Sequence, residues 1–187
     1  IKYWSNNVKG TINLLNIMDY IKCRKIVFSS SATIYGNVEN KYLIKEESKI
    51  QPINTYGKTK QVIESILETL IINKKNNWNI SILRYFNPIG AHQSGLIGED
   101  PLFPPTNIMP IINKVALGKK EFLEIYGNDW NTRDGTCIRD YIHVVDLASG
   151  HLKALKCILD NKFQFEVLNL GTGKGFTVLE LVKTFEK

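Results

Sequence analysis

Apolar residues recur along the chain with two kinds of spacing, one typical of helices and one typical of buried strands. Positions three or four residues apart predict helices over Val8 to Tyr20, Tyr56 to Lys74 and Ile108 to Leu117. Short runs rich in β-branched and aromatic residues predict strands. These strands are expected at Lys25 to Ser30, Ile80 to Tyr85, Leu123 to Tyr126, Tyr141 to Val144 and Val167 to Leu170.

Residues with helix-capping and strand-breaking character mark the ends of several elements. Asn87 and Pro88 are expected to end the strand that runs to Tyr85. Asp146 can cap a helix that continues to about Leu159. Thr177 and Glu180 have the spacing of a capping box, which predicts a final helix.

The alternation of helices with strands predicts an α/β fold built on a doubly wound parallel sheet. A Pro- and Gly-rich stretch at residues 88–110 interrupts this alternation, as expected where the chain leaves the sheet. We therefore expect a nucleotide-binding domain formed by residues 1–88 and about 136–172. A smaller substrate-binding region is expected at residues 89–135 and about 173–187. GTGKG at 171–175 is interpreted as a strand-to-helix turn, because Gly175 replaces the Ser or Thr of a phosphate loop.

Composition narrows the classes of partner. The chain has 187 residues, 43% of them hydrophobic, and a formal net charge of +6. Its lysines are scattered rather than gathered in a stripe, so nucleic acid is not an expected partner. No apolar run approaches the ~18 residues of a membrane helix, so a membrane is not expected either.

Cysteine and histidine positions predict neither a disulfide framework nor a metal site. The cysteines are odd in number and form no C-x-x-C pair, which favours a reducing, cytoplasmic location. They are Cys23, Cys137 and Cys157. The histidines have no spacing typical of metal ligands, so no metal is expected. They are His92, His143 and His151, of which His143 is interpreted as structural.

Tyr56 and Lys60 carry the strongest chemical signal. They lie one helical turn apart, so the Lys60 ammonium can approach the Tyr56 phenol, and Ser31 follows a predicted strand upstream. Ser, Tyr and Lys in this arrangement are the parts of a hydride-transfer site. A nearby cation favours the phenolate, so we expect Lys60 to lower the Tyr56 pKa. An amphipathic helix with a buried Tyr and a solvated Lys would produce the same Y-x-x-x-K string.

Longer motifs surround this pair in order along nearly the whole chain. They are NNVKGT (6–11), FSSSATIYG (28–36), NTYGKTK (54–60), LRYFNPIGAH (83–92), GEDP (98–101), IYGNDW (125–130), DGTCIRDYIHVVDLASGH (134–151) and NLGTGKGFTV (169–178). These stretches resemble the extended short-chain dehydrogenase/reductase family, and within it the enzymes that interconvert UDP-glucose and UDP-galactose. The resemblance implies a Rossmann-like fold, bound NAD, and epimerisation at C4 of a UDP-sugar through a transient 4-keto intermediate, as in galactose metabolism.

The family's glycine turn, G-x-x-G-x-x-G, is absent from the beginning of this sequence. In the resembled family that turn holds the cofactor pyrophosphate at a helix N-terminus. We therefore expect the chain to be an internal piece of a longer enzyme. The Rossmann-like sheet is then incomplete at its N-terminus, and part of the substrate-binding region lies beyond Lys187.

The resemblance also implies residue roles. The implied catalytic residues are Tyr56, Ser31 and Lys60. Residues near the cofactor are Asn6, Ser29, Ser30, Tyr56, Lys60 and Tyr85, with Gly57 letting the cofactor approach the helix. Residues implied to contact the UDP-sugar are Ser31, Thr33, Tyr56, Asn87, Asn107 and Arg139.

Some of these residues have structural alternatives, and some positions depart from the family pattern. A helix N-cap is an equal alternative for Asn6, and Ser29 and Ser30 can satisfy backbone groups at a strand end. A salt bridge from Arg139 to Asp140 is the structural alternative for that pair. The departures are Thr106, where the family has a second asparagine, and Cys137, where it has glycine.

Three further expectations concern reaction class and assembly. Ala32 stands where dehydratases of the family carry an acid, and it cannot protonate a leaving hydroxyl, which argues against dehydration. The remaining alternatives are an epimerase acting on UDP-glucuronate or UDP-N-acetylhexosamine and a non-catalytic dinucleotide-sensing protein. The helix from Tyr56 to Lys74 has more apolar surface than one sheet contact needs, so we expect a homodimer through it.

Overall fold

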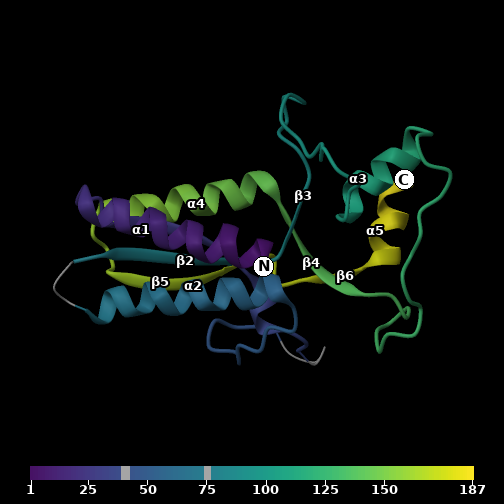
Figure 1. The fold of residues 1–187 in the computed structure, drawn as a ribbon. Helices are drawn as coiled ribbons and strands as arrows, with labels where there is room; N and C mark the ends of the chain where they lie inside the picture. Colours follow the sequence, from purple (N-terminus) through teal and green to yellow (C-terminus); the bar gives the residue numbers. More distant parts are fainter. Residues whose placement is uncertain (39–42, 74–76) are drawn as a thin grey trace. The chain divides into compact units, whose positions relative to one another are not determined.

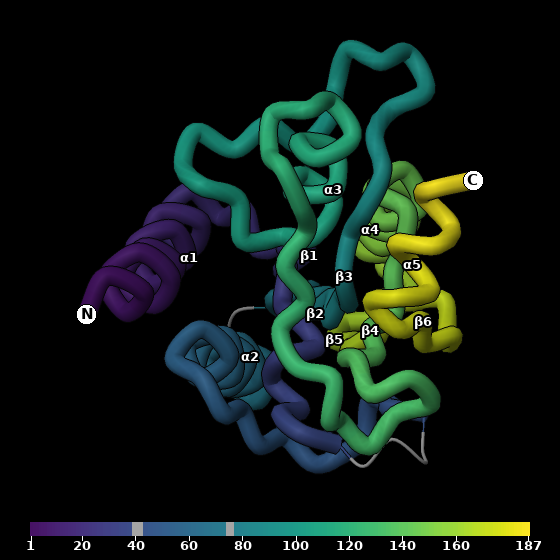
Figure 2. The backbone as a smooth tube through the Cα atoms, turned by 90° about the vertical axis from the view of Figure 1, so that its right-hand side faces the viewer, coloured from purple at the N-terminus to yellow at the C-terminus, as the bar shows by residue number. Residues whose placement is uncertain are grey.

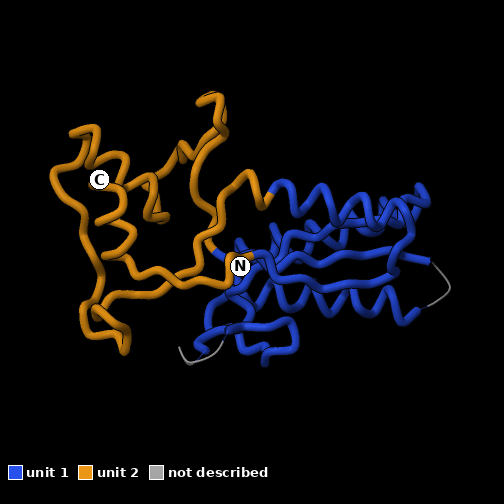
Figure 3. The backbone as a smooth tube through the Cα atoms, turned by 180° about the vertical axis from the view of Figure 1, so that it is seen from behind, with its two compact units in different colours: residues 1–86, 148–170 blue, residues 87–147, 171–187 orange. Residues whose placement is uncertain are grey.

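The structure is a computed structural model that describes residues 1–38, 43–73 and 77–187. The described chain forms two compact units, shown in blue and orange in Figure 3. Unit 1 consists of Ile1–Phe86 and Ala148–Leu170, and unit 2 of Asn87–Leu147 and Gly171–Lys187. Residues 136–147, expected in the nucleotide-binding domain, thus belong to unit 2, because their strand pairs with strands of that unit.

Unit 1 is built on a parallel sheet, as the sequence predicts. Its strands are β1 (Lys25–Ser31), β2 (Asn79–Tyr85) and β5 (Phe165–Leu170), in the order β1-β2-β5. Ser31 is in register with Tyr85, and Tyr85 with Leu170. The carboxyl ends of these strands therefore share one edge of the sheet, where parallel α/β sheets place their chemistry.

Helices cover both faces of this sheet (Figures 1 and 2). The helices on one face are the π-helix η1 (Trp4–Lys9), α1 (Gly10–Tyr20) and α2 (Thr55–Ile72). The other face is covered by α4 (Val144–Leu159). The residues of α4 from 148 onward belong to unit 1. The core between the sheet and the helices of the first face consists of Leu15, Ile63, Leu67, Trp78, Ile80 and Ile82. This arrangement confirms the doubly wound architecture.

The apolar surface of α2 is largely used inside unit 1. Ile63 and Leu67 are buried in the core, and further apolar residues of the helix pack against it, namely Ile66, Leu70 and Ile71. Val62 and Ile72 remain exposed. Packing in the core of unit 1 thus accounts for much of the α2 surface on which the sequence-based dimer prediction depends. The predicted helix end at Lys74 lies outside the described residues.

Two predicted helix starts are wrong. The chain is already helical before Val8, so Asn6 lies inside η1 and does not cap a helix. Helix α4 begins at Val144, which places Asp146 in its first turn. A carboxylate there favours the helix through its dipole rather than through a cap.

Unit 2 contains short strands and two helices. Strand β3 (Asn87–Ile89) pairs in parallel with β4 (Ile138–His143), and β4 pairs antiparallel with β6 (Gly175–Thr177). The sequence missed β3 and β6, because each is a three-residue strand whose pairing comes from a distant segment. Gly175 accordingly begins a strand and does not complete a strand-to-helix turn.

The helices of unit 2 follow the sequence more closely. They are α3 (Ile108–Ala116) and α5 (Val178–Phe185). Thr177 and Glu180 form the predicted capping box at the start of α5. The strand predicted at Leu123 to Tyr126 is wrong, because this segment has no strand partner among the described residues, and Ile125 and Tyr126 are exposed. Within the described parts of the chain, no helix is both long and apolar enough to cross a membrane.

Candidate active site at the carboxyl edge of the sheet

Ser31 and Tyr85 occupy neighbouring positions at the carboxyl edge of the unit 1 sheet. Ser31 is 8% exposed, and its Oγ accepts hydrogen bonds from the Thr33 backbone N–H at 3.3 Å and from the Thr33 hydroxyl at 3.0 Å. The short 3-10 helix η2 (Ala32–Tyr35) follows directly, with Ser31 as its N-cap. Local capping therefore fixes the Ser31 hydroxyl and places Thr33 beside it.

Tyr56 lies in the first turn of α2, and local interactions hold this turn in place. Asn54 is the N-cap, and its Oδ1 accepts a hydrogen bond from the Gly57 N–H at 2.7 Å. A Cβ at position 57 would lie 2.9 Å from both Pro52 Cβ and the Thr33 carbonyl oxygen. Gly57 is therefore required for close packing of α2 against η2, whereas the sequence interpretation assigned it to cofactor approach.

Lys60 extends from the next turn of α2 toward β1. Its Nζ donates a hydrogen bond to the Ser29 carbonyl at 2.7 Å. The same nitrogen lies 4.9 Å from the centre of the Phe28 ring and 5.5 Å from that of Tyr56. An ammonium carries three donors, and the Ser29 bond uses one of them, so the group can also bind hydroxyls such as those of a ribose.

Burial dominates the titration of both groups. It raises the pKa of Tyr56, with Coulombic interactions from Tyr85 and Tyr3 adding to the rise and a hydrogen bond with Ser31 opposing it. Burial lowers the pKa of Lys60, and the Glu64 carboxylate opposes this change. In the protein alone, the Tyr56 pKa thus moves opposite to the sequence prediction, because desolvation disfavours the phenolate.

The serines before Ser31 bind side chains rather than strand-end backbone groups. Ser29 Oγ lies 2.9 Å from His151 Nε2 on α4. Ser30 is fully buried, and its hydroxyl donates to the Glu64 carboxylate. The Tyr85 ring lies 6.0 Å from the His151 ring, centre to centre. The backbone role suggested for Ser29 and Ser30 is therefore wrong.

Asn6 is exposed on η1, while its neighbours contact α2. Asn7 Nδ2 donates to the Thr59 hydroxyl at 3.0 Å, and the Tyr3 ring meets the Tyr56 ring edge-on at 5.9 Å. Neither Tyr3 nor Asn7 was identified from the sequence. Their contacts join segments more than fifty residues apart, which no local pattern reveals.

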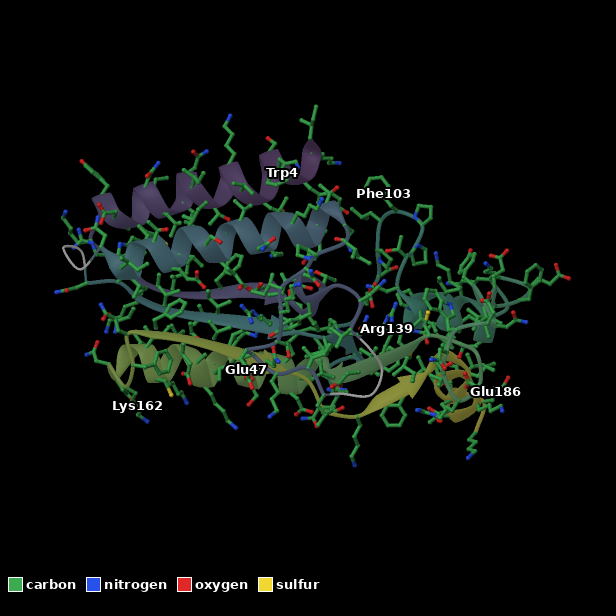
Figure 4. The ribbon with its side chains drawn as sticks, turned by 90° about the horizontal axis from the view of Figure 1, so that it is seen from below. Trp4, Glu47, Phe103, Arg139, Lys162 and Glu186 are labelled. Atoms are coloured by element: carbon green, nitrogen blue, oxygen red, sulfur yellow. The ribbon has the colours of Figure 1, made fainter. Side chains whose placement is uncertain are left out.

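The remaining predicted site residues belong to unit 2, where each makes its own contact. Asn87 is exposed on β3, and Asn107, the N-cap of α3, donates through Nδ2 to Glu99 at 2.6 Å. Arg139, labelled in Figure 4, is exposed on β4 and donates to the Ile138 carbonyl at 2.9 Å.

Asp140 does not form the salt bridge proposed as the structural alternative for Arg139. Its carboxylate accepts hydrogen bonds from the backbone N–H groups of Thr172 and Gly173 at 2.9 and 2.8 Å, and from the Thr172 hydroxyl at 2.7 Å. Asp140 thus holds the Gly-rich turn that follows β5, and this contact leaves Arg139 exposed.

The sequence interpretation also missed a buried ion pair between α2 and β2. The Arg84 Nη2 donates to Glu64 Oε2 at 2.6 Å, and the two side chains are 4% and 3% exposed. Two signals in the sequence could have revealed it. Glu64 interrupts the apolar face of α2, and Arg84 follows the apolar pair Ile82 and Leu83 inside a strand expected to be buried.

Comparison with known proteins places the chain in a family. The profile of the NAD dependent epimerase/dehydratase family matches residues 1–171. The chain belongs to this family. UDP-glucose 4-epimerase 2 of Oryza sativa subsp. japonica is 53% identical over 99% of the chain and 45% of its own length. UDP-glucose 4-epimerase of Bacillus subtilis is 52% identical over 100% of the chain and 54% of its own length. The chain thus spans about half the length of the curated relatives it matches.

Solved structures agree with this assignment. UDP-glucose-4-epimerase from Stenotrophomonas maltophila, with bound NAD and formylated UDP-arabinopyranose, has a TM-score of 0.93 at 44% identity, covering 99% of this chain and 54% of that one. UDP-glucose 4-epimerase from Bifidobacterium longum, in complex with NAD+ and UDP, has a TM-score of 0.90 at 45% identity, covering 100% and 55%. The parallel sheet of unit 1 is therefore Rossmann-like, as predicted.

Proposed function

We propose that this chain provides the catalytic edge of an NAD-dependent epimerase that interconverts UDP-glucose and UDP-galactose at C4. The observation that carries the proposal is the cluster of Ser31, Tyr56 and Lys60 on a chain half identical to named UDP-glucose 4-epimerases. Relatives' names and the bound groups of the solved structures support the substrate class and NAD.

Tyr56 moves the proton in this proposal. Its phenol oxygen takes the proton of the sugar 4-hydroxyl as the C4 hydrogen leaves as hydride, and it returns a proton to the 4-keto oxygen when hydride comes back to the opposite face. NAD, when bound, accepts and returns the hydride and brings a positive charge that favours the phenolate. Because burial raises the Tyr56 pKa in the protein alone, that added charge matters for the proton-accepting state.

Ser31 and Lys60 orient the reacting groups. The Ser31 hydroxyl interacts with Tyr56 and can bind the same sugar oxygen, with Thr33 beside it. The Lys60 ammonium, fixed by the Ser29 carbonyl, would bind hydroxyls of the nicotinamide ribose. Asn6, Ser29 and Tyr85 are proposed to lie near the cofactor. Ser30, being fully buried, would support the site from inside.

Unit 1 is proposed to bind the dinucleotide and the reacting hydroxyl of the sugar, and unit 2 the rest of the UDP-sugar. Arg139 is exposed, and its planar guanidinium suits a diphosphate, while the amides of Asn87 and Asn107 can bind phosphate or sugar oxygens. Asn107 is bound to Glu99 in the described structure, so substrate binding would replace that hydrogen bond.

We further propose a homodimer and a cytoplasmic role in galactose metabolism. Exposed apolar residues on α1 and α2 support the dimer, namely Leu14, Ile17, Val62 and Ile72. The free cysteines support a reducing compartment. Sedimentation of the complete protein that carries residues 1–187 tests the dimer, and a monomer at micromolar concentration would contradict it.

Turnover assays on the complete protein test the proposed activity. UDP-galactose is supplied, and UDP-glucose formation is measured beside matched assays with UDP-N-acetylglucosamine and UDP-glucuronate. We expect conversion of UDP-galactose to proceed with the highest kcat/KM. Faster conversion of another sugar would transfer the assignment to that epimerase. The absence of turnover with NAD bound would indicate a non-catalytic dinucleotide-binding protein.

A further inference from the structure

Glu64 is a buried carboxylate at the centre of a polar network in unit 1. It is 2% exposed and accepts hydrogen bonds from the Ser30 hydroxyl on β1 and from Arg84 Nε and Nη2 on β2. Arg84 Nη1 in turn donates to the Tyr35 hydroxyl and to the Glu46 carbonyl, both at 2.9 Å. The network therefore joins α2 to the sheet and to η2.

Glu64 shares one face of α2 with the residues of the proposed active site. Tyr56, Lys60 and Glu64 are spaced four residues apart, so they lie above one another along the helix. Two of them bind consecutive residues of β1. Lys60 donates to the Ser29 carbonyl, and Glu64 accepts from the Ser30 hydroxyl. The next residue, Ser31, lowers the pKa of Tyr56 through its hydroxyl. These contacts set the register of the helix against the strand.

We propose that Glu64 is a positioning residue of the epimerase: its bonds to Ser30 and Arg84 hold α2 in the register that places Tyr56 and Lys60 against Ser31. This inference rests on the proposed function. A buried ion pair with a purely structural role would not need to contact the strand that carries Ser31. Glu64 instead binds the residue between Ser29 and Ser31, so a shift of its contact moves both proposed active-site contacts together.

The charge of Glu64 gives the position a second consequence. Its carboxylate favours the ammonium form of Lys60 against desolvation. Other titratable or charged groups around these two residues are Tyr56 on α2, Arg84 on β2, Tyr35 on η2 and, through Ser29, His151 on α4. Loss of the carboxylate therefore lowers the Lys60 pKa further, and activity that needs the ammonium would end at a lower pH.

Glu64→Gln in the complete protein is the first test, with Glu68→Gln as its matched control. Glu68 lies one turn further along α2 and is exposed. We expect Glu64→Gln to lower kcat about 10- to 100-fold, the scale of a misplaced reacting group, with KM for the UDP-sugar changed much less. The high-pH limb of the kcat profile should move to lower pH. Glu68→Gln should match the parent in both respects.

Two further variants separate positioning from stability. The double variant Glu64→Gln with Arg84→Gln leaves no unpaired buried charge, so it should fold even if the single variant does not. It should retain the shifted pH limb, because Lys60 still lacks its neighbouring carboxylate. Ser30→Ala removes one register contact and no charge, so it should lower kcat without moving the pH limb.

The outcomes distinguish this inference from the proposed function. A parent protein without epimerase activity removes the proposed function, and the positioning role falls with it. An active parent whose folded Glu64 and Ser30 variants keep the parental kcat and pH profile would overturn the positioning role alone. Loss of thermal stability without either kinetic change would do the same, because it would show a purely structural ion pair.

Discussion

Each unit of the protein contains an arginine–glutamate ion pair, and the two pairs lie in opposite environments. In unit 1 the Arg84 and Glu64 side chains are 4% and 3% exposed. In unit 2 the Arg133 and Glu180 side chains are 49% and 40% exposed. Water screens the second pair, so it contributes little, whereas removing one partner of the first leaves an uncompensated buried charge.

The same contrast applies to the proposed site residues. In unit 1, Ser31 ends β1 and Lys60 binds the Ser29 carbonyl of that strand, next to the buried groups of Ser30 and Glu64. The proposed site residues of unit 2 lie on short strands and at helix ends. Local turns and caps hold these elements; Asp140, for example, binds the Gly-rich turn that follows β5. In the proposed function, unit 1 would fix the reacting groups and unit 2 would present exposed binding groups.

Breaking the buried pair should give the largest effect. Arg84→Met in the complete protein is expected to lower the free energy of unfolding by about 3–5 kcal/mol, because Glu64 is left buried and unpaired. This loss is measured by denaturant unfolding of the parent and of variants at Arg84 and at Glu64. Arg133→Met is the matched control, and a comparable loss there would contradict the distinction between the two pairs.

Substitution of proposed site residues should separate chemistry from binding. Tyr56→Phe is expected to lower kcat by at least ~10²-fold with NAD still bound, because the proton-transfer group is lost. Arg139→Leu should mainly raise KM for the UDP-sugar. Tyr20→Phe, at an exposed position on α1, is the control. Near-parental kcat for Tyr56→Phe would remove Tyr56 from the mechanism.

Removal of the α5 cap tests how locally unit 2 is stabilised. Thr177 is buried, its hydroxyl donates to Asp134, and its Oγ accepts from the Glu180 N–H at 3.1 Å. Thr177→Ala should cost about 1 kcal/mol. Hydrogen exchange should show faster opening confined to α5. Thr184→Ala, at an exposed position of the same helix, should leave the exchange pattern unchanged, and opening that spreads into unit 1 would contradict local stabilisation.

The smallest expected effect is the acid titration of the exposed pair. Hydrogen bonds from Arg133 and the Thr177 N–H lower the pKa of Glu180 from 4.5 to about 2. Because the pKa of Glu180 is lower in the folded state, its ionised carboxylate stabilises the fold at pH values above its ordinary pKa of 4.5. This stabilisation is lost as the pH falls from 4.5 toward about 2. Carboxyl NMR titration of Glu180 measures it. An ordinary pKa would show that the pair does not persist in solution.

The sequence by itself determined the main elements of unit 1 and the placement of Tyr56 and Lys60 on one helix face. Apolar periodicity located α2, and short runs of β-branched and aromatic residues located β1, β2 and β5, because buried helix faces and buried strands both need apolar residues. The spacing of Tyr56 and Lys60 predicted that both lie on one helix face. The structure confirms this, because Lys60 Nζ lies 5.5 Å from the centre of the Tyr56 ring. Motif order indicated the family that the comparisons establish.

The tertiary structure alone decided what depends on distant neighbours. Strands β3 and β6 are too short for a periodic signal, and they form because β4 pairs with both. Burial reversed the expected direction of the Tyr56 pKa, since desolvation depends on everything packed around the phenol. The Glu64 network joins residues from β1, α2, η2 and β2, so only folding brings its charges together.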